Sequence, residues 1–344
     1  MLHVQSYARS PSNSLESHMR LITYRADGRE HLAVLLDADK TVLDLAAAAP
    51  GRPEFGSMLA LIESGADGLA RAADIVAERP AQAIRDASDV RWCAPLPRPP
   101  RVRDCALFTE HLSAALREMA RRQAAAAEDP AAALDELLAS GRFTLDPLFA
   151  QRVLYYQVDP LSITGPEEVI EPPDGATELD YELELAAVIG RGGRDIAPED
   201  AAGYIFGYTI CNDWSARDLQ LRLMRTGVGA GESKDFSTTL GPCLVTADEF
   251  ADPYALTMRA RVEGEQVSFG STASMTHTFA EAVAQFSRIG RGVVAGEVIV
   301  SGTVASGTGF DAGRRLSPGD TVELEIDGIG VLRNRVGVAR EVNP

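Results

Sequence analysis

Residues 179–190 are LDYELELAAVIG, an apolar run interrupted by carboxylates. Side chains alternate between the two faces of a strand, so Glu182 and Glu184 share one face and Leu183 points the other way. Two buried carboxylates repel each other unless one takes a proton or a cation lies between them. The pattern therefore has two interpretations: a buried cation site, or the solvent-exposed acidic face that a lone Glu-x-Glu more often marks.

A second informative stretch is GYTICNDWSARDLQ at 207–220. Ser215, followed three residues on by Asp218, has the form of a helix N-cap with an acidic third residue. We therefore predict that a strand ends near Asp213 and that a helix begins after it, with Ser215 as its N-cap. Asp213 at such a corner is either a cation ligand or an ordinary turn residue.

Two further segments add polar groups to this region. Arg217 and Gln220 are three apart and share a helix face, although Arg217 alone could equally be a solvated helix charge. The run KDFSTTLGP at 234–242 then places a lysine and three hydroxyl residues before a turn.

Composition excludes several classes of protein. The chain has 344 residues, of which 45% are hydrophobic and 24% charged, and no apolar stretch is long enough to cross a bilayer. The net charge of -17 repels a phosphate backbone, and no basic stripe interleaved with aromatic residues offsets it. We expect neither nucleic acid nor membrane as a partner. A carboxylate substrate would need a local cation or basic cluster.

The four cysteines are widely spaced and form neither a Cys-x-x-Cys zinc pair nor a dense disulfide framework. We therefore expect a reduced, cytoplasmic setting. Residues 1–18 are polar, with no apolar core of a secretion signal, and are expected to be a disordered leader, with Met19 as an alternative start.

The order of apolar runs and breakers predicts two domains. Strands are expected at 20–25 and 31–36, followed by a third short strand and two helices, which makes a small α/β domain over 19–88. The Pro-rich segment 89–100 is the predicted linker, because proline cannot continue a helix. Residues 101–344 form the predicted second domain, β-rich after an alanine-rich helical segment, so the chain as a whole is α+β.

Taken together, these segments resemble the fumarylacetoacetate hydrolase family. The family core carries an acidic Glu-x-Glu strand, then Asn-Asp-x-Ser-Ala-Arg-Asp, then Lys-x-Phe, and NDWSARD at 212–218 is the specific part of the match. The resemblance covers roughly residues 101–340 and implies a mixed β-sandwich or roll, often assembled as a homodimer.

The resemblance also implies a metal site. Glu182, Glu184 and Asp213 fall on the family's three core carboxylates, and the upstream segment RDCALFTEH at 103–111 supplies Asp104 as a fourth. Carboxylate oxygens prefer hard cations, so Mg²⁺, Mn²⁺ or Ca²⁺ is expected rather than zinc or copper.

The remaining polar residues of the match fall on positions that the family uses around its substrate and metal. By this match the catalytic residues are the general base His111 with Arg217, Gln220 and Lys234, the substrate contacts are Tyr156 and Thr303, and a further metal-site position is Thr238. A structural role for His111 at a helix end is the alternative.

One departure concerns the acidic partner of His111. Fumarylacetoacetases carry an orienting glutamate near the C-terminal sheet, and residues 306–314 hold no secure equivalent. Smaller acylpyruvase-like members carry a glutamate three residues after the histidine, where this chain has Ala114. The candidate partners are Glu110, Glu118 and Asp311.

The resemblance implies a metal-dependent hydrolase that cleaves a carbon–carbon bond in a small 2,4-dioxo acid, of the fumarylacetoacetate or acylpyruvate type, through a metal-stabilised enolate. The same chemistry serves decarboxylases, isomerases and hydratases of related 2-oxo acids, and fold similarity does not choose between them. A non-catalytic cation-binding β domain would need only the carboxylates. We also expect the helical segment 112–141 to cover the mouth of the site.

Overall fold

The computed structural model describes residues 19–339. The predicted leader at 1–18 lies outside this range. Within it, no helix combines the length and apolar character that crossing a membrane requires. The four cysteines, all of which lie in the described range, are unpaired, as their spacing predicts.

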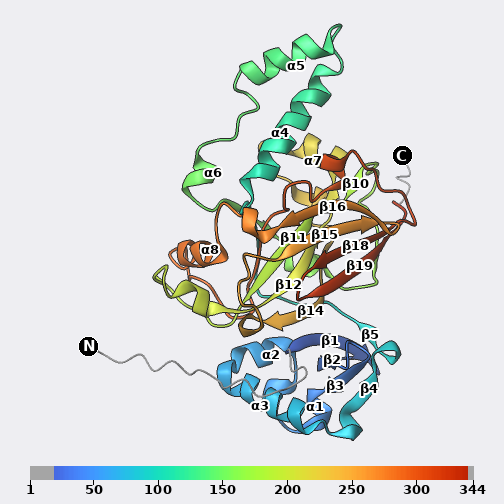
Figure 1. The fold of residues 1–344 in the computed structure, drawn as a ribbon, viewed down its shortest axis with the longest axis vertical. Helices are drawn as coiled ribbons and strands as arrows, with labels where there is room; N and C mark the ends of the chain where they lie inside the picture. The colour runs from blue at the N-terminus through green and yellow to red at the C-terminus, as the bar shows by residue number, and fades with distance from the viewer. Residues whose placement is uncertain (1–18, 340–344) are drawn as a thin grey trace.

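The first part of the chain is a small unit of strands and helices (Figure 1). Its strands are β1 (Arg20–Ala26), β2 (Arg29–Leu36), β3 (Thr41–Asp44), β4 (Ile84–Asp86) and β5 (Arg91–Trp92). Its helices are α1 (Leu45–Ala48), α2 (Met58–Glu63) and α3 (Gly65–Glu78). The strands predicted at 20–25 and 31–36 are confirmed. Ser57 caps α2 by accepting a hydrogen bond from the amide of Ala60.

The main sheet has twelve strands in the order β4-β3-β2-β1-β14-β12-β11-β17-β6-β7, with β5 beside β1 and β8 beside β14. The N-terminal unit joins this sheet because β1 pairs with β14. The other strands are β6 (Val102–Cys105), β7 (Tyr155–Val158), β8 (Ile163–Thr164), β11 (Leu183–Ile189), β12 (Ile205–Asp213), β14 (Thr238–Thr246) and β17 (Val298–Val300).

A second sheet of five strands packs against the first. Its order is β16 (Glu265–Ser271), β15 (Thr257–Val262), β18 (Thr321–Ile326), β19 (Gly330–Val336) and β9 (Val169–Ile170). Alternate residues of β15 and β18 are buried, and Met258 and Leu324 share one apolar cluster with Leu183 and Leu185 of β11. Two sheets with a common core confirm the predicted mixed β-sandwich within an α+β fold.

The prediction that alternate side chains of the acidic strand point to opposite faces is also confirmed. Leu183 and Leu185 enter the core between the sheets, whereas Ala186 and Val188 belong to a second apolar cluster on the opposite face, which includes Leu21 of β1. Both faces of β11 are therefore buried. An exposed acidic face is excluded.

The remaining α-helices follow residue 100. They are α4 (Thr109–Ala124), α5 (Pro130–Ala139), α6 (Leu148–Gln151), α7 (Arg217–Met224), α8 (Phe279–Phe286) and α9 (Gly309–Ala312). The helical segment is interrupted at Pro130, the first residue of α5, where Asp129 accepts hydrogen bonds from the amides of Ala131 and Ala132 as the N-cap.

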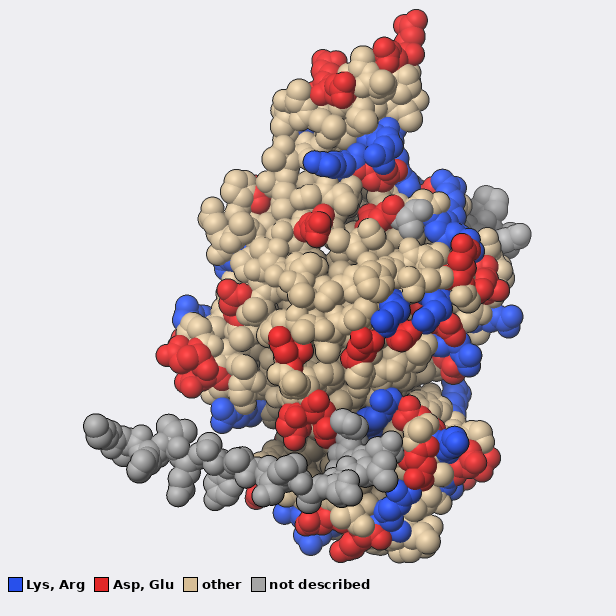
Figure 2. Space-filling view, in the orientation of Figure 1, with Lys and Arg blue, Asp and Glu red and all other residues tan. Residues whose placement is uncertain are grey.

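The α4–α5 hairpin projects away from the sheets instead of lying across them (Figure 1). No side chain of α5 is buried, and α4 buries only Ala120 and Ala124. Figure 2 shows basic side chains along the middle of the hairpin and acidic ones at its tip. Only the first part of the α4–α5 hairpin, the start of α4, therefore lies close to the sheets.

The predicted strand end near Asp213 and the helix after it are confirmed, since β12 ends at Asp213 and α7 follows, but Ser215 as the helix N-cap is wrong. Ser215 and Ala216 form the short strand β13 (Ser215–Ala216), which pairs with β10 (Leu179–Asp180), and α7 begins at Arg217. Asp218 instead accepts hydrogen bonds from the amide and hydroxyl of Thr177. The long-range strand pairing overrides the local capping signal.

Candidate active site

Four buried carboxylates meet at one end of the main sheet. The strands β6 and β12 both run opposite to β11, so their carboxyl ends lie beside its amino end. This brings together Asp104, Glu182, Glu184 and Asp213, each of which offers one carboxylate oxygen within 4.8 Å of those of the others. The predicted convergence of Glu182, Glu184 and Asp213 is confirmed, and Asp104 joins them.

Lys234 and Tyr156 each donate hydrogen bonds to two members of this cluster. Lys234 Nζ lies 2.7 Å from Glu182 Oε2 and also contacts Asp213. The Tyr156 hydroxyl lies 2.9 Å from Asp104 Oδ2 and also donates to Asp213. Tyr156, predicted to contact substrate, therefore touches two of the candidate metal ligands.

The electrostatics of the cluster favour an additional positive charge. Burial and the neighbouring carboxylates raise the pKa of Asp104 and of Glu184, and burial also raises the pKa of Asp213. Glu182 differs: burial opposes its ionisation, but Lys234 and then Arg217 outweigh burial and lower its pKa. Without a further cation, protonation is therefore favoured at Asp104, Glu184 and Asp213 but not at Glu182.

Unpaired oxygens give a direct test of whether a metal fits. Among the described residues, Glu184 Oε1 and Asp213 Oδ1 are buried without a hydrogen-bond partner, and so is Thr238 Oγ1. Thr238 lies opposite Asp213 in the β12–β14 register and thus on the same face. Buried polar atoms normally have partners, and carboxylate oxygens suit hard cations. The residues fit a divalent metal such as Mg²⁺ or Mn²⁺.

His111 lies in the first turn of α4 and pairs with Asp311 of α9. Its Nδ1 atom is 2.7 Å from Asp311 Oδ2. Of the other candidate partners, Glu110 is exposed, and Glu118 forms ion pairs with Arg121 and Arg122. His111 lies close enough to the cluster to act electrostatically on Glu182.

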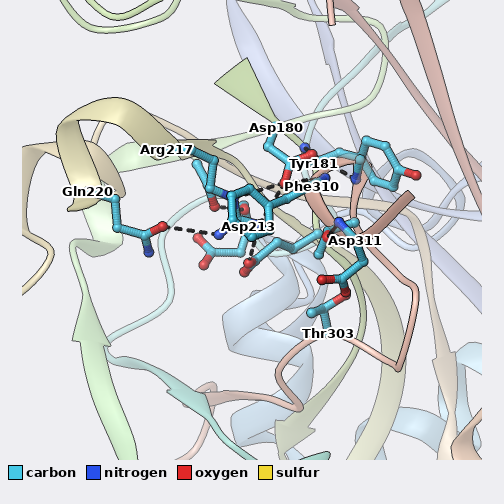
Figure 3. Close-up of polar contacts among 12 residues, drawn as sticks. Asp180, Tyr181, Asp213, Arg217, Gln220, Thr303, Phe310 and Asp311 are labelled. Carbon is cyan, nitrogen blue, oxygen red and sulfur yellow. Dashed lines mark hydrogen bonds and ion pairs between the residues drawn. The ribbon is translucent and has the colours of Figure 1, made fainter. Parts of the chain in front are cut away.

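Arg217 links the cluster to the helix α7. Its Nη2 atom lies 2.7 Å from Glu182 Oε1, its Nε atom 2.8 Å from Asp180 Oδ2, and its Nη1 atom 3.1 Å from Gln220 Oε1 (Figure 3). The predicted common face of Arg217 and Gln220 is confirmed. Asp180 had no predicted role, and its acidic character directly before the Glu-x-Glu strand was the only signal in the sequence.

Thr303 lies below Asp311 in Figure 3. Its side chain is buried, and its hydroxyl donates to the carbonyl of Leu183 at 3.2 Å. This hydrogen bond holds the 303–311 segment against the acidic strand, which also bridges to it through Glu182 and Thr308. A contact between Thr303 and substrate remains a prediction.

Comparison with known proteins supports the same assignment. Residues 135–337 match the family model described as fumarylacetoacetate (FAA) hydrolase C-terminal. Oxaloacetate tautomerase YisK of Bacillus subtilis (strain 168) is 37% identical over 186 residues, which cover 54% of this chain and 61% of the relative. Human mitochondrial oxaloacetate tautomerase FAHD2A is 39% identical over 180 residues, which cover 51% of this chain and 56% of the relative.

The similarity extends to the whole fold. The fumarylacetoacetate hydrolase from psychrophilic Exiguobacterium antarcticum matches 94% of this chain and 100% of its own, with 30% identity and a TM-score of 0.69. The two curated relatives, by contrast, are matched over less than two thirds of their length. With its matched family model and its buried four-carboxylate site, the chain belongs to the fumarylacetoacetate hydrolase family.

Proposed function

We propose that the chain is a divalent-metal-dependent enzyme that interconverts the keto and enol forms of a small 2-oxo dicarboxylic acid such as oxaloacetate. The observation that carries this proposal is the His111–Asp311 pair beside the four-carboxylate cluster. A cation held by these carboxylates would act as a Lewis acid toward the oxo group and favour the enolate. The protein must then supply a base.

His111 has the arrangement of a general base. The Asp311 carboxylate accepts a hydrogen bond, so Nδ1 carries the proton and Nε2 is left to take one. Nε2 would remove a proton from the carbon next to the oxo group and return it to either end of the enolate. Keto–enol interconversion requires only this transfer.

Lys234 and Gln220 have donors left for the substrate. An ammonium group has three N–H donors, and Lys234 uses two of them on Glu182 and Asp213. Gln220 accepts from Arg217 through Oε1, which leaves its amide NH₂ group for a substrate oxygen. Both groups would stabilise negative charge as it develops.

The sequence relatives support this choice of reaction. The two relatives described above are named oxaloacetate tautomerases and align at 37% and 39% identity. The aligned region covers only part of each, so the substrate is inferred from the site and these names together.

The second candidate is the hydrolase predicted from the sequence, which would cleave a 2,4-dioxo acid of the fumarylacetoacetate or acylpyruvate type. The same His111–Asp311 pair favours it, because an oriented imidazole can also activate water for attack on a carbonyl. The whole-chain structural match to a fumarylacetoacetate hydrolase is a further argument.

One assay separates these functions. The full chain, stripped with EDTA and reloaded with Mg²⁺ or Mn²⁺, is given enol oxaloacetate and a panel of acylpyruvates while loss of enol absorbance and release of pyruvate are followed. We expect metal-dependent loss of the enol without cleavage. Faster cleavage of an acylpyruvate would favour the hydrolase.

Two histidine variants complete the assay. His111→Gln should lose roughly 100-fold or more in kcat, the usual contribution of a general base. His277→Gln is the matched control, because His277 is also largely buried but bonds through Nε2 to the carbonyl of Phe149. Full activity of His111→Gln, or full activity after EDTA, would contradict the proposal.

A further inference from the structure

Asp180 is a buried carboxylate whose two oxygens have different partners. Oδ2 accepts from Arg217 Nε at 2.8 Å and from the amide of Phe310 at 3.2 Å. Oδ1 accepts from the amide of Gly309 at 2.8 Å. Figure 3 shows Asp180 between Arg217 and the segment that carries Phe310 and Asp311.

The partners of both Asp180 oxygens connect this residue to other groups of the candidate active site. Arg217 continues to Glu182 at 2.7 Å. Gly309 and Phe310 form the first turn of α9, and Asp311 in the same turn holds His111. The Asp180 carboxylate thus links two parts of the site. One is the His111–Asp311 pair, and the other is the Arg217 guanidinium beside the acidic cluster.

The packing around the Asp180 carboxylate leaves no space for a side chain at position 309. A Cβ atom placed on Gly309 would lie 2.7 Å from Asp180 Oδ1 and 2.6 Å from the carbonyl oxygen of Arg314, closer than real Cβ atoms approach. Glycine at position 309 is therefore required for the amide to reach Asp180.

We propose that Asp180 is a positioning residue, which holds the His111–Asp311 pair and Arg217 in one fixed arrangement around Glu182. Asp180 acts through these residues and contacts no reacting atom itself. Its effect on turnover rests on the proposed function, whereas its effect on the His111–Asp311 hydrogen bond does not.

Two variants test the proposal in the full-length, metal-loaded protein. Asp180→Asn preserves size but turns an NH₂ group toward partners that are all donors. Gly309→Ala disturbs the same contact from the other side. Each should lower kcat about 10- to 100-fold with KM within about threefold, as loss of an orienting group does. Because both variants break the shared Asp180–Gly309 contact, the loss in the double variant should be smaller than the product of the two single losses.

A spectroscopic readout separates positioning from stability. The Nδ1 proton of His111, hydrogen-bonded to Asp311, gives an NMR resonance that is identified by its absence in His111→Gln. This resonance should broaden or disappear in Asp180→Asn and Gly309→Ala. Each variant should still bind Mn²⁺ in a separate binding measurement. Asp44→Asn is the control, because Asp44 is also buried and accepts from the Ala47 amide and the Tyr24 hydroxyl, but in the N-terminal unit.

The outcomes are distinct. Retention of both kcat and the resonance in Asp180→Asn or Gly309→Ala would overturn the proposal, as would equal losses in Asp44→Asn. If Asp180→Asn does not fold, Gly309→Ala decides. If the wild-type protein does not convert oxaloacetate, the proposed function fails, and the resonance alone still decides the role of Asp180.

Discussion

His111 Nδ1 lies 2.7 Å from Asp311 Oδ2, although the two residues are 200 positions apart in the chain. The contact forms because the first turn of α4 and the short helix α9 meet beside the acidic strand. Thr308 fixes the turn by accepting from the Asp311 amide at 3.0 Å. The orientation of the proposed base therefore depends on a segment far from it in sequence.

This relationship predicts the effect of Asp311→Asn. An amide can present its NH₂ group to His111, which would put the imidazole in the wrong tautomer and remove the base. We expect kcat to fall on the order of 100-fold in steady-state assays, with unchanged Mn²⁺ affinity by calorimetry. Glu110→Gln is the control, since Glu110 was also a candidate partner but is exposed. Equal activity of the two variants would contradict the assignment.

Local patterns predicted part of the acidic cluster. Strand alternation placed Glu182 and Glu184 on one face, but the sequence alone did not distinguish a buried strand from an exposed acidic face. The predicted end of the next strand placed Asp213 at a corner, where it could be either a cation ligand or an ordinary turn residue. Asp104 required the family resemblance, because no local pattern relates a carboxylate on β6 to one on β11.

What the sequence did not provide are contacts between distant segments. Asp311 was one of three candidates, and only the position of the 303–311 segment against the acidic strand selects it. The hydrogen bond from the Gly309 amide to Asp180 joins residues that are 129 positions apart. It forms because residue 309 is a glycine, and no sequence motif marks that requirement. Ser215 was misassigned because a nearby capping signal competed with a strand pairing that the sequence does not show.

Removal of the metal should destabilise the protein, because Asp104 and Glu184 then face other carboxylates without compensation. A ligand at a hundredfold excess over its Kd stabilises by about 2.7 kcal/mol, which corresponds to about 3 to 5 °C in Tm for a chain of this size. Differential scanning fluorimetry with Mg²⁺ or EDTA measures this shift.

Two variants test the origin of that shift. Glu184→Gln should lose most of it. Glu297→Gln should keep it, because Glu297 is a buried carboxylate that pairs with Arg101 and Arg103 instead. A Mg²⁺-dependent shift that survives in Glu184→Gln would show that the cation binds elsewhere.

The metal-dependent shift should also grow with pH. In the metal-free protein the pKa values of Asp104 and Glu184 are raised above those of the unfolded chain, chiefly by burial. Their contribution to stability is therefore present at low pH and is lost as pH rises through the folded-state values. A bound cation reverses this loss, because it stabilises the ionised carboxylates.

We therefore expect the difference in Tm between Mg²⁺ and EDTA samples to be small near about pH 5 and larger near about pH 8. Glu182 should contribute little to this trend, since Lys234 and Arg217 outweigh burial and lower its pKa. A difference in Tm that falls with rising pH would contradict the assignment of Asp104 and Glu184 as ligands.

The last prediction concerns the α4–α5 hairpin, which meets the site through Arg122. The Arg122 guanidinium lies 4.1 Å from the centre of the Phe310 ring, and its Nη1 atom lies 3.3 Å from Glu178 Oε2. Arg217 lies 5.6 Å from the centre of the same ring. A cation–π contact of this kind contributes about 0.5 to 2 kcal/mol. Arg122 therefore anchors the hairpin to the turn that carries Asp311.

Arg122→Ala should loosen this anchor without affecting the carboxylates. We expect faster hydrogen exchange over residues 112–141, a roughly 2- to 30-fold lower kcat/KM, as the contact energy predicts, and unchanged Mn²⁺ affinity. Arg117→Ala is the matched control, because Arg117 is exposed on the same helix and has no ion pair or ring contact within residues 19–339. If both variants retain wild-type exchange and kinetics toward every accepted substrate, the hairpin is independent of the site, and its predicted role as a cover is wrong.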